Sequence, residues 1–151
     1  MVTLTPIGIV RSPVTKMSQG NWAQVDSEIH LDAQYAPGLQ GLGEFSHVMV
    51  LFHLHEAQGF DVKKQLLRRP RGREDLREVG VFAQRTKYRP SPIGVTSVKL
   101  LSIRGNIVSV RGLDALDGTP VLDLKPYMPV FDRVEDARMP DWVVHFMDGY
   151  F

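Results

Sequence analysis

Cysteine is absent from the 151-residue sequence, which excludes a disulfide framework, a thiolate nucleophile and a thiolate metal site. The sequence also lacks any apolar run of about 18 residues, the length that a transmembrane helix requires. Residues 1–13 alternate in character and include Arg11, unlike the continuous apolar region of a signal peptide. We therefore expect a cytoplasmic protein that does not enter a membrane.

Two glycine-rich signatures are absent as well. The sequence has no G-x-x-x-x-G-K-[ST] loop for phosphates and no strand followed by G-x-G-x-x-G for a dinucleotide. The interleaved helices of a doubly wound sheet are not visible either. These absences exclude a P-loop enzyme and argue against a Rossmann-type methyltransferase.

Positive charge is concentrated in one part of a chain whose net charge is only +1. Residues 63–89 hold ten of the eighteen Lys and Arg residues but only three acidic residues, so this segment carries +7 and the remainder −6. Such an uneven distribution favours a polyanionic partner that contacts one side of the molecule. A basic loop that merely faces solvent is the alternative, and charge alone does not decide between them.

Short strand-like segments dominate the sequence, and several end in turn residues. Arg104-Gly105-Asn106 is typical of a hairpin, and residues 117–120 (DGTP) are typical of a tight turn. The nearly continuous apolar run of residues 48–54 predicts a strand that is buried on both sides. The predicted strands are 4–10, 25–31, 48–54, 79–83, 95–103, 107–110 and 121–125.

Helix is scarce, with short helical turns predicted over 35–45 and 62–67. Six or seven short strands with little helix between them indicate a mainly β fold, a barrel or a sandwich. We expect a single domain with a core over residues 5–130 and an aromatic C-terminal tail over 131–151. Exposure of the tail's aromatic side chains would be unfavourable, so we predict that it packs on the barrel or on a second subunit. These side chains are Trp142, Phe146, Tyr150 and Phe151.

Two histidines mark the end of the predicted 48–54 strand. His53 and His55 lie two residues apart, so their side chains are predicted to project from one face. Strand-borne zinc sites use this spacing, but a third ligand is not evident apart from His47, which has the same parity. We therefore expect no metal, and we predict that His55 and Glu56 reach a ligand cavity.

Four collinear segments carry a more specific pattern. They are residues 7–13 (IGIVRSP), 38–57 (GLQGLGEFSHVMVLFHLHEA), 79–94 (VGVFAQRTKYRPSPIG) and 112–127 (GLDALDGTPVLDLKPY). In this order and spacing, they resemble the TsaA-like (TrmO) family of tRNA adenosine N6-methyltransferases, and the match covers most of the chain. The resemblance implies a compact non-Rossmann β-barrel that binds S-adenosylmethionine, with tRNA as its partner. It also implies methylation of threonylcarbamoyl-adenosine beside the anticodon, and we expect a homodimer.

The sequence departs from the family pattern in two places. The family usually shows R-S-x-x-R-P-N-P where this chain has residues 85–92, RTKYRPSP. Thr86 keeps a hydroxyl, whereas Ser91 replaces an amide that both donates and accepts. The chain also ends soon after the predicted barrel, whereas many bacterial relatives carry a further C-terminal domain. We therefore expect a smaller tRNA footprint, or one that another subunit completes.

The chemistry of methyl transfer to an exocyclic adenine nitrogen suggests the catalytic candidates. That nitrogen is a poor nucleophile, because its lone pair is delocalised into the ring, and a carboxylate that accepts one of its hydrogens would localise the pair. Asp114 is the predicted carboxylate, whereas Asp117, directly before Gly118, is more typical of a turn aspartate that bonds its own backbone. Arg85 and Arg89 come just before a stiff Pro-Ser-Pro stretch and are the predicted anion donors. Two surface arginines near an acidic tail are the structural alternative.

The remaining candidates bind the cofactor or RNA. The resemblance implies cofactor contacts from the loop after the first strand, the end of the buried strand, Arg85 and the backbone before Asp114. These residues are Met17, Ser18, Gln19, His55, Glu56, Arg85, Gly112 and Leu113. The predicted RNA contacts are Arg68, Arg69, Arg71, Arg89, Lys125 and Tyr127.

Two other functions use the same features. A catalytically silent RNA-binding module would use the basic face and the aromatic residues without a cofactor site. A methyltransferase acting on another acceptor, such as a different tRNA or a small molecule, would keep the cofactor site but not the substrate. Binding of S-adenosylmethionine separates the first from the favoured function, and mass analysis of tRNA nucleosides separates the second.

Overall fold

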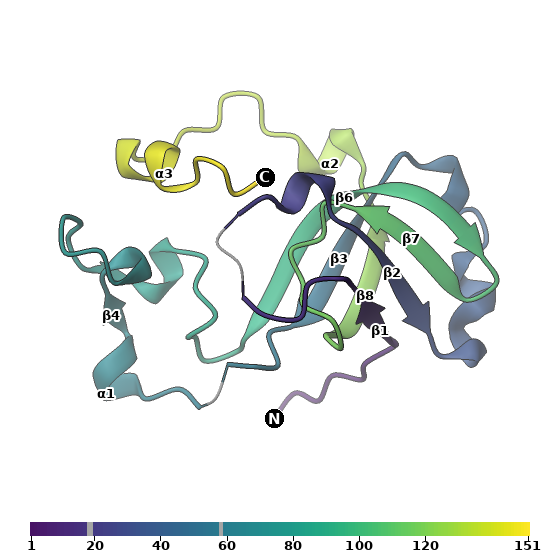
Figure 1. Ribbon diagram of the computed structural model, residues 1–151, viewed down its shortest axis with the longest axis horizontal. Coiled ribbons are helices and arrows are strands. Elements are labelled where there is room, and N and C mark those ends of the chain that lie inside the picture. The colour runs from purple at the N-terminus through teal and green to yellow at the C-terminus, as the bar shows by residue number, and fades with distance from the viewer. Residues whose placement is uncertain (18–19, 58) are drawn as a thin grey trace.

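The computed structural model describes residues 1–17, 20–57 and 59–151, and its centre is a closed antiparallel barrel (Figure 1). Neighbouring strands around the barrel follow the order β1-β2-β7-β6-β3-β8. A mainly β barrel is therefore confirmed, and the sandwich is not observed. The barrel strands are β1 (Gly8–Arg11), β2 (Asp26–Leu31), β3 (His47–His53), β6 (Ile93–Arg104), β7 (Ile107–Arg111) and β8 (Pro120–Pro126).

The interior of the barrel is filled by alternate residues of each strand, as the two-residue period of a strand requires. In β3, Val48, Val50 and Phe52 are buried, whereas the residues between them are only partly covered. The prediction that this strand is buried on both sides was therefore wrong, because only the side chains that face the apolar interior of the barrel are fully covered. The core joins these three side chains to Val10, Ile29, Leu31, Leu39, Val98, Val108, Val110, Leu113, Ala115 and Val121.

Close packing inside the barrel also explains one glycine. A Cβ atom at Gly94 of β6 would lie 2.5 Å from Cε2 of the buried Phe52 ring. Gly94 pairs directly with Phe52 in the β3–β6 register. The ring therefore covers the glycine, and the aromatic side chain occupies the volume that a larger residue at position 94 would need.

The β6–β7 hairpin and the turn before β8 follow the predictions. Gly105 has φ 61° between β6 and β7, and Gly118 has φ 83° in the turn that ends at β8, so both positions need glycine. The first strand begins at Gly8, later than predicted, and the 79–83 strand shrinks to β5 (Val79–Gly80), followed by a 3₁₀ turn, η5 (Val81–Ala83). The 35–45 turn resolves into η2 (Ala33–Leu39) and η3 (Leu42–Glu44).

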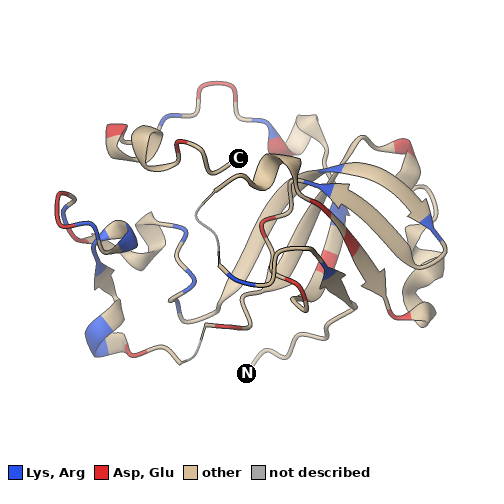
Figure 2. Ribbon diagram, in the orientation of Figure 1, with Lys and Arg blue, Asp and Glu red and all other residues tan. Residues whose placement is uncertain are grey.

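Residues 54–57 and 59–92 form an arm that leaves the barrel after β3 and returns at β6 (Figure 1). It contains α1 (Val62–Gln65), β4 (Leu67–Arg68), η4 (Pro70–Gly72), β5 and η5, and β4 pairs with β5 as a separate two-stranded sheet. Figure 2 shows that this arm carries many of the Lys and Arg residues. We call residues 54–92 the basic arm.

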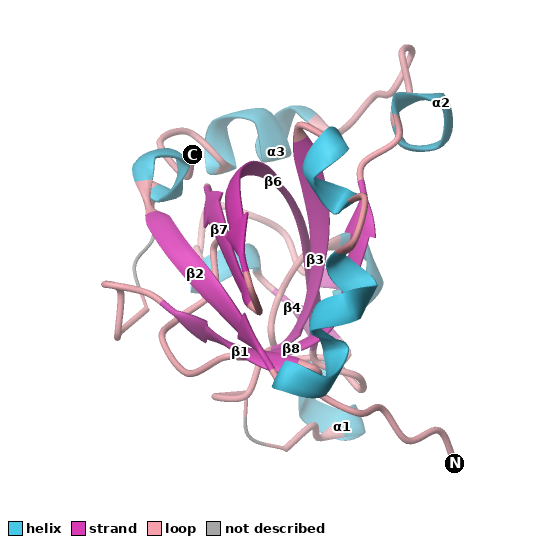
Figure 3. Ribbon diagram, turned by 90° about the vertical axis from the view of Figure 1, so that its right-hand side faces the viewer, coloured by secondary structure: helices cyan, strands magenta, loops and turns pink. Residues whose placement is uncertain are grey.

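The C-terminal tail packs on the same chain. After α2 (Pro129–Asp132) the chain crosses to α3 (Asp141–Phe146) and then returns to η1 (Trp22–Gln24) beside the barrel (Figure 1). Figure 3 shows α2 and α3 at the same end of the molecule and α1 at the other. Of the two predicted positions for the tail, packing on its own barrel is therefore the one observed. Among the described residues, no helix is both long and apolar enough to cross a membrane.

Candidate active site

Asp114 is held by two hydroxyl groups that come from distant parts of the chain. The Thr96 hydroxyl of β6 donates to Oδ1 of Asp114 over 2.5 Å, and the Tyr150 hydroxyl of the tail donates to Oδ2. Asp114 itself stays partly exposed. The carboxylate is thus fixed in orientation and accessible, which are the two properties that a hydrogen-accepting catalytic group needs.

The loop that carries Asp114 is anchored in the barrel core. Leu113 is fully buried and Ala115 is 3% exposed, so the residues on both sides of Asp114 are held by packing. Gly112 has φ 94° and donates its N–H to the Val25 carbonyl over 3.0 Å. A Cβ at this glycine would meet nothing within 4 Å, so its role is the left-handed backbone and not a close approach. Because the Leu113 side chain lies in the core, only its backbone could meet a cofactor.

Backbone hydrogen bonds bring the tail to this loop. Asn21 donates to the Gly149 carbonyl over 2.9 Å, and Trp22 donates to the Tyr150 carbonyl over 3.0 Å. A Cβ at Gly20 would lie 2.2 Å from the Gly149 oxygen, so the two segments are in direct backbone contact. Sequence reasoning predicted a packed tail but missed Tyr150 as a site residue, because the pairing joins segments about 130 residues apart and has no local pattern.

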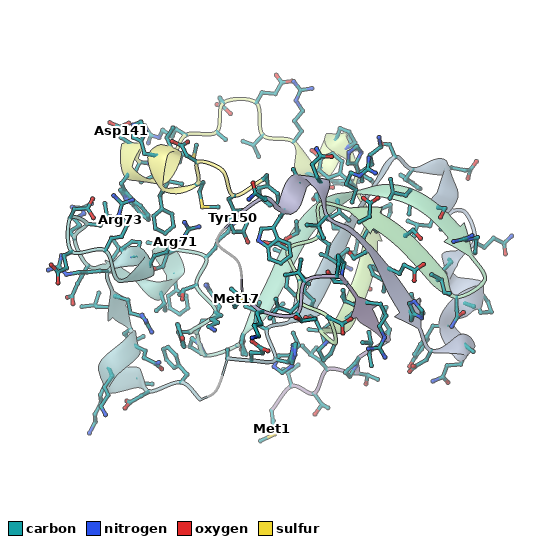
Figure 4. All side chains as sticks on the ribbon, in the orientation of Figure 1. Met1, Met17, Arg71, Arg73, Asp141 and Tyr150 are labelled. Atoms are coloured by element: carbon teal, nitrogen blue, oxygen red, sulfur yellow. The ribbon has the colours of Figure 1, made fainter. Side chains whose placement is uncertain are left out.

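The surroundings of Tyr150 favour the protonated phenol more strongly than water does. Burial raises the pKa of Tyr150 most, and the Asp114 charge and hydrogen bond raise it further, well above the ordinary tyrosine value. Arg71 and Arg85 oppose the rise through their positive charges. Figure 4 shows Arg71 and Tyr150 where the tail meets the basic arm. Two cations therefore act on the phenol that donates to Asp114.

Arg85 and Arg89, predicted together, have different surroundings. Nη1 of Arg89 donates to the carbonyls of Gln84 and Thr86 over 3.0 and 3.1 Å, so this guanidinium holds the turn that carries Arg85. The Arg85 side chain is exposed, and within the part of the chain that the structure describes no hydrogen bond or ion pair engages it. Arg85 is thus the one of the two that can meet a ligand anion without breaking an internal contact.

His55 and Glu56 lie in a turn after β3, not in the strand itself. The strand ends at His53, and the His55 amide donates to the His53 carbonyl over 2.8 Å. The prediction that His53 and His55 share a strand face was therefore wrong, because the backbone turns between them. Both His55 and Glu56 are exposed, and the Leu54 amide joins their turn to the Pro92 carbonyl over 2.8 Å. The turn thus lies beside the segment that follows Arg85.

The other predicted cofactor loop is described only in part. Met17 is 63% exposed, and Ser18 and Gln19 lie outside the described residues. An open cavity of about 540 Å³ lies near the base of this loop, and its lining includes Ser12 and Asp117 but none of the predicted cofactor residues. The Asp117 side chain accepts from the Ser12 amide over 3.0 Å, so it joins two loops and does not bond its own turn.

Three predicted RNA-binding arginines make contacts within the protein. Arg68 stacks at 4.2 Å on the Tyr88 ring, and Arg71 lies 4.3 Å from the centre of the Phe146 ring in the tail. Nη1 of Arg69 donates to the carbonyls of Glu74 and Leu76 and so holds the loop. A stacked guanidinium keeps its N–H edge available to phosphate, because those donors lie in the ring-parallel plane.

Lys125 and Tyr127 belong to β8 and the segment after it. Nζ of Lys125 forms an ion pair with Asp123 over 2.8 Å, and the Tyr127 ring packs edge-on against His47 at 6.3 Å. No described contact joins either residue to Asp114. In residues 1–17, 20–57 and 59–151, no group of three or more His, Asp or Glu side chains is placed to hold a metal ion.

Comparisons by family, by sequence and by structure all find proteins named for tRNA methylation or for binding S-adenosylmethionine. The tRNA-methyltransferase O N-terminal domain family matches residues 12–133. A protein of Archaeoglobus fulgidus named S-adenosyl-L-methionine-binding protein is 38% identical over 139 residues, which cover 89% of this chain and 96% of that protein. The tRNA (adenine(37)-N6)-methyltransferase of Escherichia coli is 36% identical over 144 residues, 87% of this chain and 60% of the enzyme. The crystal structure of TrmO from Pseudomonas aeruginosa is similar with a TM-score of 0.73 and 32% identity, over 91% of this chain and 61% of that one.

Changing Gly20 to alanine tests the docking of the tail. The added Cβ would clash with the Gly149 carbonyl, so the tail should detach and expose the Asn21 and Trp22 amides. Hydrogen exchange of these two amides should become faster by about tenfold or more. Gly38→Ala is the matched control, because its Cβ meets nothing within 4 Å. Unchanged exchange in Gly20→Ala would show that the tail does not dock in this way.

Proposed function

We propose a function from one premise, that the chain belongs to the tRNA-methyltransferase O N-terminal domain family. The chain transfers a methyl group from S-adenosylmethionine to N6 of an adenosine in tRNA. The observation that carries this proposal is the Asp114 carboxylate, fixed by the hydroxyls of Thr96 and Tyr150 yet partly exposed. Arg85 is exposed, and its charge acts on the Tyr150 phenol that donates to Asp114.

The extent of the similarity differs between relatives. The chain spans about three fifths of the Escherichia coli enzyme and of the Pseudomonas aeruginosa structure, 60% and 61%. It spans 96% of the Archaeoglobus fulgidus S-adenosyl-L-methionine-binding protein. The matched region therefore corresponds to a unit that occurs almost alone in one relative and with further chain in the others.

The exposed candidates suit S-adenosylmethionine by charge. Its amino-acid end carries a carboxylate and an ammonium group, and Arg85 and Glu56 offer one charge of each sign on adjoining segments. His55, exposed in the same turn as Glu56, adds a polar ring. When bound, the cofactor supplies an activated methyl group on a sulfonium. We propose that these three side chains and the Gly112–Leu113 backbone hold it, with Met17. Ser18 and Gln19, which lie outside the described residues, stay proposed as further contacts.

Asp114 supplies the chemistry that the acceptor nitrogen needs. A carboxylate has about four lone-pair sites, and the two hydroxyls occupy one on each oxygen. The remaining sites accept a hydrogen of the adenine amine, which localises the nitrogen lone pair for in-line displacement. The buried neighbours of Asp114 hold it in place. Alignment of this kind lowers the activation barrier by several kcal/mol, on the order of the effect of orienting two reacting groups. Arg89 contributes by holding the turn of Arg85.

The substrate we propose is adenosine 37 with its threonylcarbamoyl group. The Escherichia coli relative is named for adenine 37 of tRNA. A threonylcarbamoyl group adds a carboxylate beside N6, and a guanidinium such as Arg85 pairs with it or with the cofactor carboxylate. Transfer RNA that lacks the modification would then be a poorer acceptor.

Asparagine at position 114 tests the catalytic assignment. Asp114→Asn should lower turnover at saturating tRNA and cofactor by about 100-fold or more, the size typical of a lost acid–base group. Arg85→Ala should also lower turnover. The assay uses labelled methyl donor with bulk tRNA, followed by mass analysis of the labelled nucleoside, and calorimetry follows cofactor binding. Asp32→Asn is the control, since Asp32 is exposed and its side chain makes no capping bond.

Two outcomes would contradict this proposal. Wild-type protein that binds tRNA but labels no nucleoside, and releases no heat with the cofactor, would be a silent RNA-binding module. A label on a nucleoside other than an N6-modified adenosine would show a different acceptor.

We propose that the basic arm contacts tRNA phosphates. Changing Arg68, Arg69 and Arg71 to alanine should weaken tRNA binding and reduce the slope of log affinity against log salt by about 2–3, since each phosphate contact contributes about 0.7–0.9. Turnover at saturating tRNA should fall less than in Asp114→Asn. The matched control replaces Lys99, Arg104 and Arg138 with alanine. These residues lie outside the arm, and their replacement removes the same amount of positive charge. An equal change of slope in both triple variants would reject the assignment to the arm.

Lys125 and Tyr127, in β8 and the segment after it, stay proposed as further RNA contacts.

A homodimer is also proposed. Exposed apolar side chains gather around α2 and the segment that leads to α3, at Val130, Phe131, Val134 and Met139, which are from 59% to 86% exposed. Burial of such a surface on a second copy would stabilise a symmetric dimer. Light scattering at micromolar concentration should give twice the 17.0 kDa chain mass, and Phe131→Glu should lower it. A monomer with full activity would reject the dimer.

A further inference from the structure

The two hydroxyls on Asp114 differ in origin. Thr96 belongs to β6 and is paired with Val50 of β3 inside the barrel sheet, so its position is set by the barrel itself. Tyr150 comes from the tail, whose residues 149–150 accept backbone hydrogen bonds from residues 21–22. The tail therefore completes the environment of a carboxylate that the barrel alone holds by one bond.

We propose that Tyr150 is a positioning residue for methyl transfer, whose hydroxyl fixes the Asp114 carboxylate in the orientation that accepts a hydrogen of the adenine amine. This inference rests on the proposed function and assigns the tail a role within it. A carboxylate held at one oxygen by Thr96 can still rotate about its terminal bond, which has a broad torsional profile. A second donor at Oδ2 removes that freedom and leaves the other lone pairs open.

Three features of the tail suit this role. The Tyr150 ring meets the Phe151 ring edge-on at 4.7 Å, and Arg71 lies 5.9 Å from its centre, so the ring has contacts besides its hydroxyl. The phenol is protonated at neutral pH even at the ordinary tyrosine pKa, and burial and the Asp114 charge raise its pKa further, so it donates to Asp114. Asp114 remains partly exposed with the tail in place, so Tyr150 orients the carboxylate without sealing it.

Phenylalanine at position 150 removes the hydroxyl and keeps the ring and the backbone pairing. Tyr150→Phe should lower kcat about tenfold, the order expected when one hydrogen bond to a charged group is lost. The KM for tRNA and the melting temperature should stay close to wild type, because neither the arm nor the tail backbone changes. Tyr35→Phe is the control, since this tyrosine is partly buried against the core cluster and lies in η2, away from the contacts of Asp114.

The kinetic outcomes separate the roles that the tail could have. A faster Tyr150→Phe enzyme would show that the tail blocks the site, and an unchanged kcat would show that the hydroxyl is dispensable. A raised KM with unchanged kcat would make Tyr150 an RNA contact. Each of these three results would overturn the positioning role.

A titration tests the contact without any activity. In protein with ¹³C-labelled tyrosine rings, Tyr150 should titrate well above ordinary tyrosines, and Asp114→Asn should lower its pKa by removing the charge while burial remains. Identical titration in both proteins would overturn the positioning role even if methyl transfer is observed. If Asp114→Asn lowers the pKa of Tyr150 but wild-type protein methylates no tRNA, the contact is real and the proposed function fails. The positioning role then fails because there is no reaction for it to serve.

Discussion

Asp114 accepts one hydrogen bond from the barrel and one from the tail, and the arrangement of the site depends on this shared acceptor. The hydrogen bond from the barrel, donated by Thr96, follows from the unequal lengths of β6 and β7. β6 pairs with β7 only from Lys99 onward, although it begins at Ile93, so the first half of β6 has no β7 neighbour. The loop after β7 runs in that place and sets Asp114 against Thr96. A carboxylate on a loop thereby gains the precision of a residue on a strand.

The tail side depends on a weaker set of contacts. Two backbone hydrogen bonds, the hydroxyl of Tyr150 and the stacking of Arg71 on Phe146 hold a short helix and its extension against the barrel and the arm. A four-residue or six-residue helix has little stability of its own, so tertiary contacts supply most of it. The same contacts link the arm to Asp114, because Arg71 belongs to the arm and its charge acts on Tyr150.

Much of the barrel could be predicted from the sequence, because period and turn chemistry are local. The alternating 25–31 segment and the Gly105 hairpin fix the β2, β6 and β7 elements almost to the residue. Burial on both sides of β3 was mispredicted, since a continuous apolar run does not reveal whether a second layer covers the outer face. The 79–83 strand was overpredicted because only two residues find a partner, in β4.

Residues of the candidate site could be predicted from the sequence only where the proposed chemistry requires a particular residue type. Asp114 follows from the need for a carboxylate beside a buried loop, and Arg85 from a motif beside rigid prolines. Tyr150 does not follow, since nothing in the tail sequence distinguishes it from Trp142 or Phe151 until the Gly20 and Gly149 backbones meet.

The arrangement also separates affinity from chemistry within one small chain. Most of the concentrated positive charge lies on an arm outside the barrel, where long-range attraction to a polyanion needs no precise geometry. The carboxylate lies on the barrel, where packing fixes it. The tail is the physical connection between them, because one face of it contacts Arg71 of the arm and its end contacts Asp114. If the basic arm binds RNA as proposed, an RNA that displaces Arg71 from the Phe146 ring would act on Asp114 through Tyr150, because the tail contacts both residues.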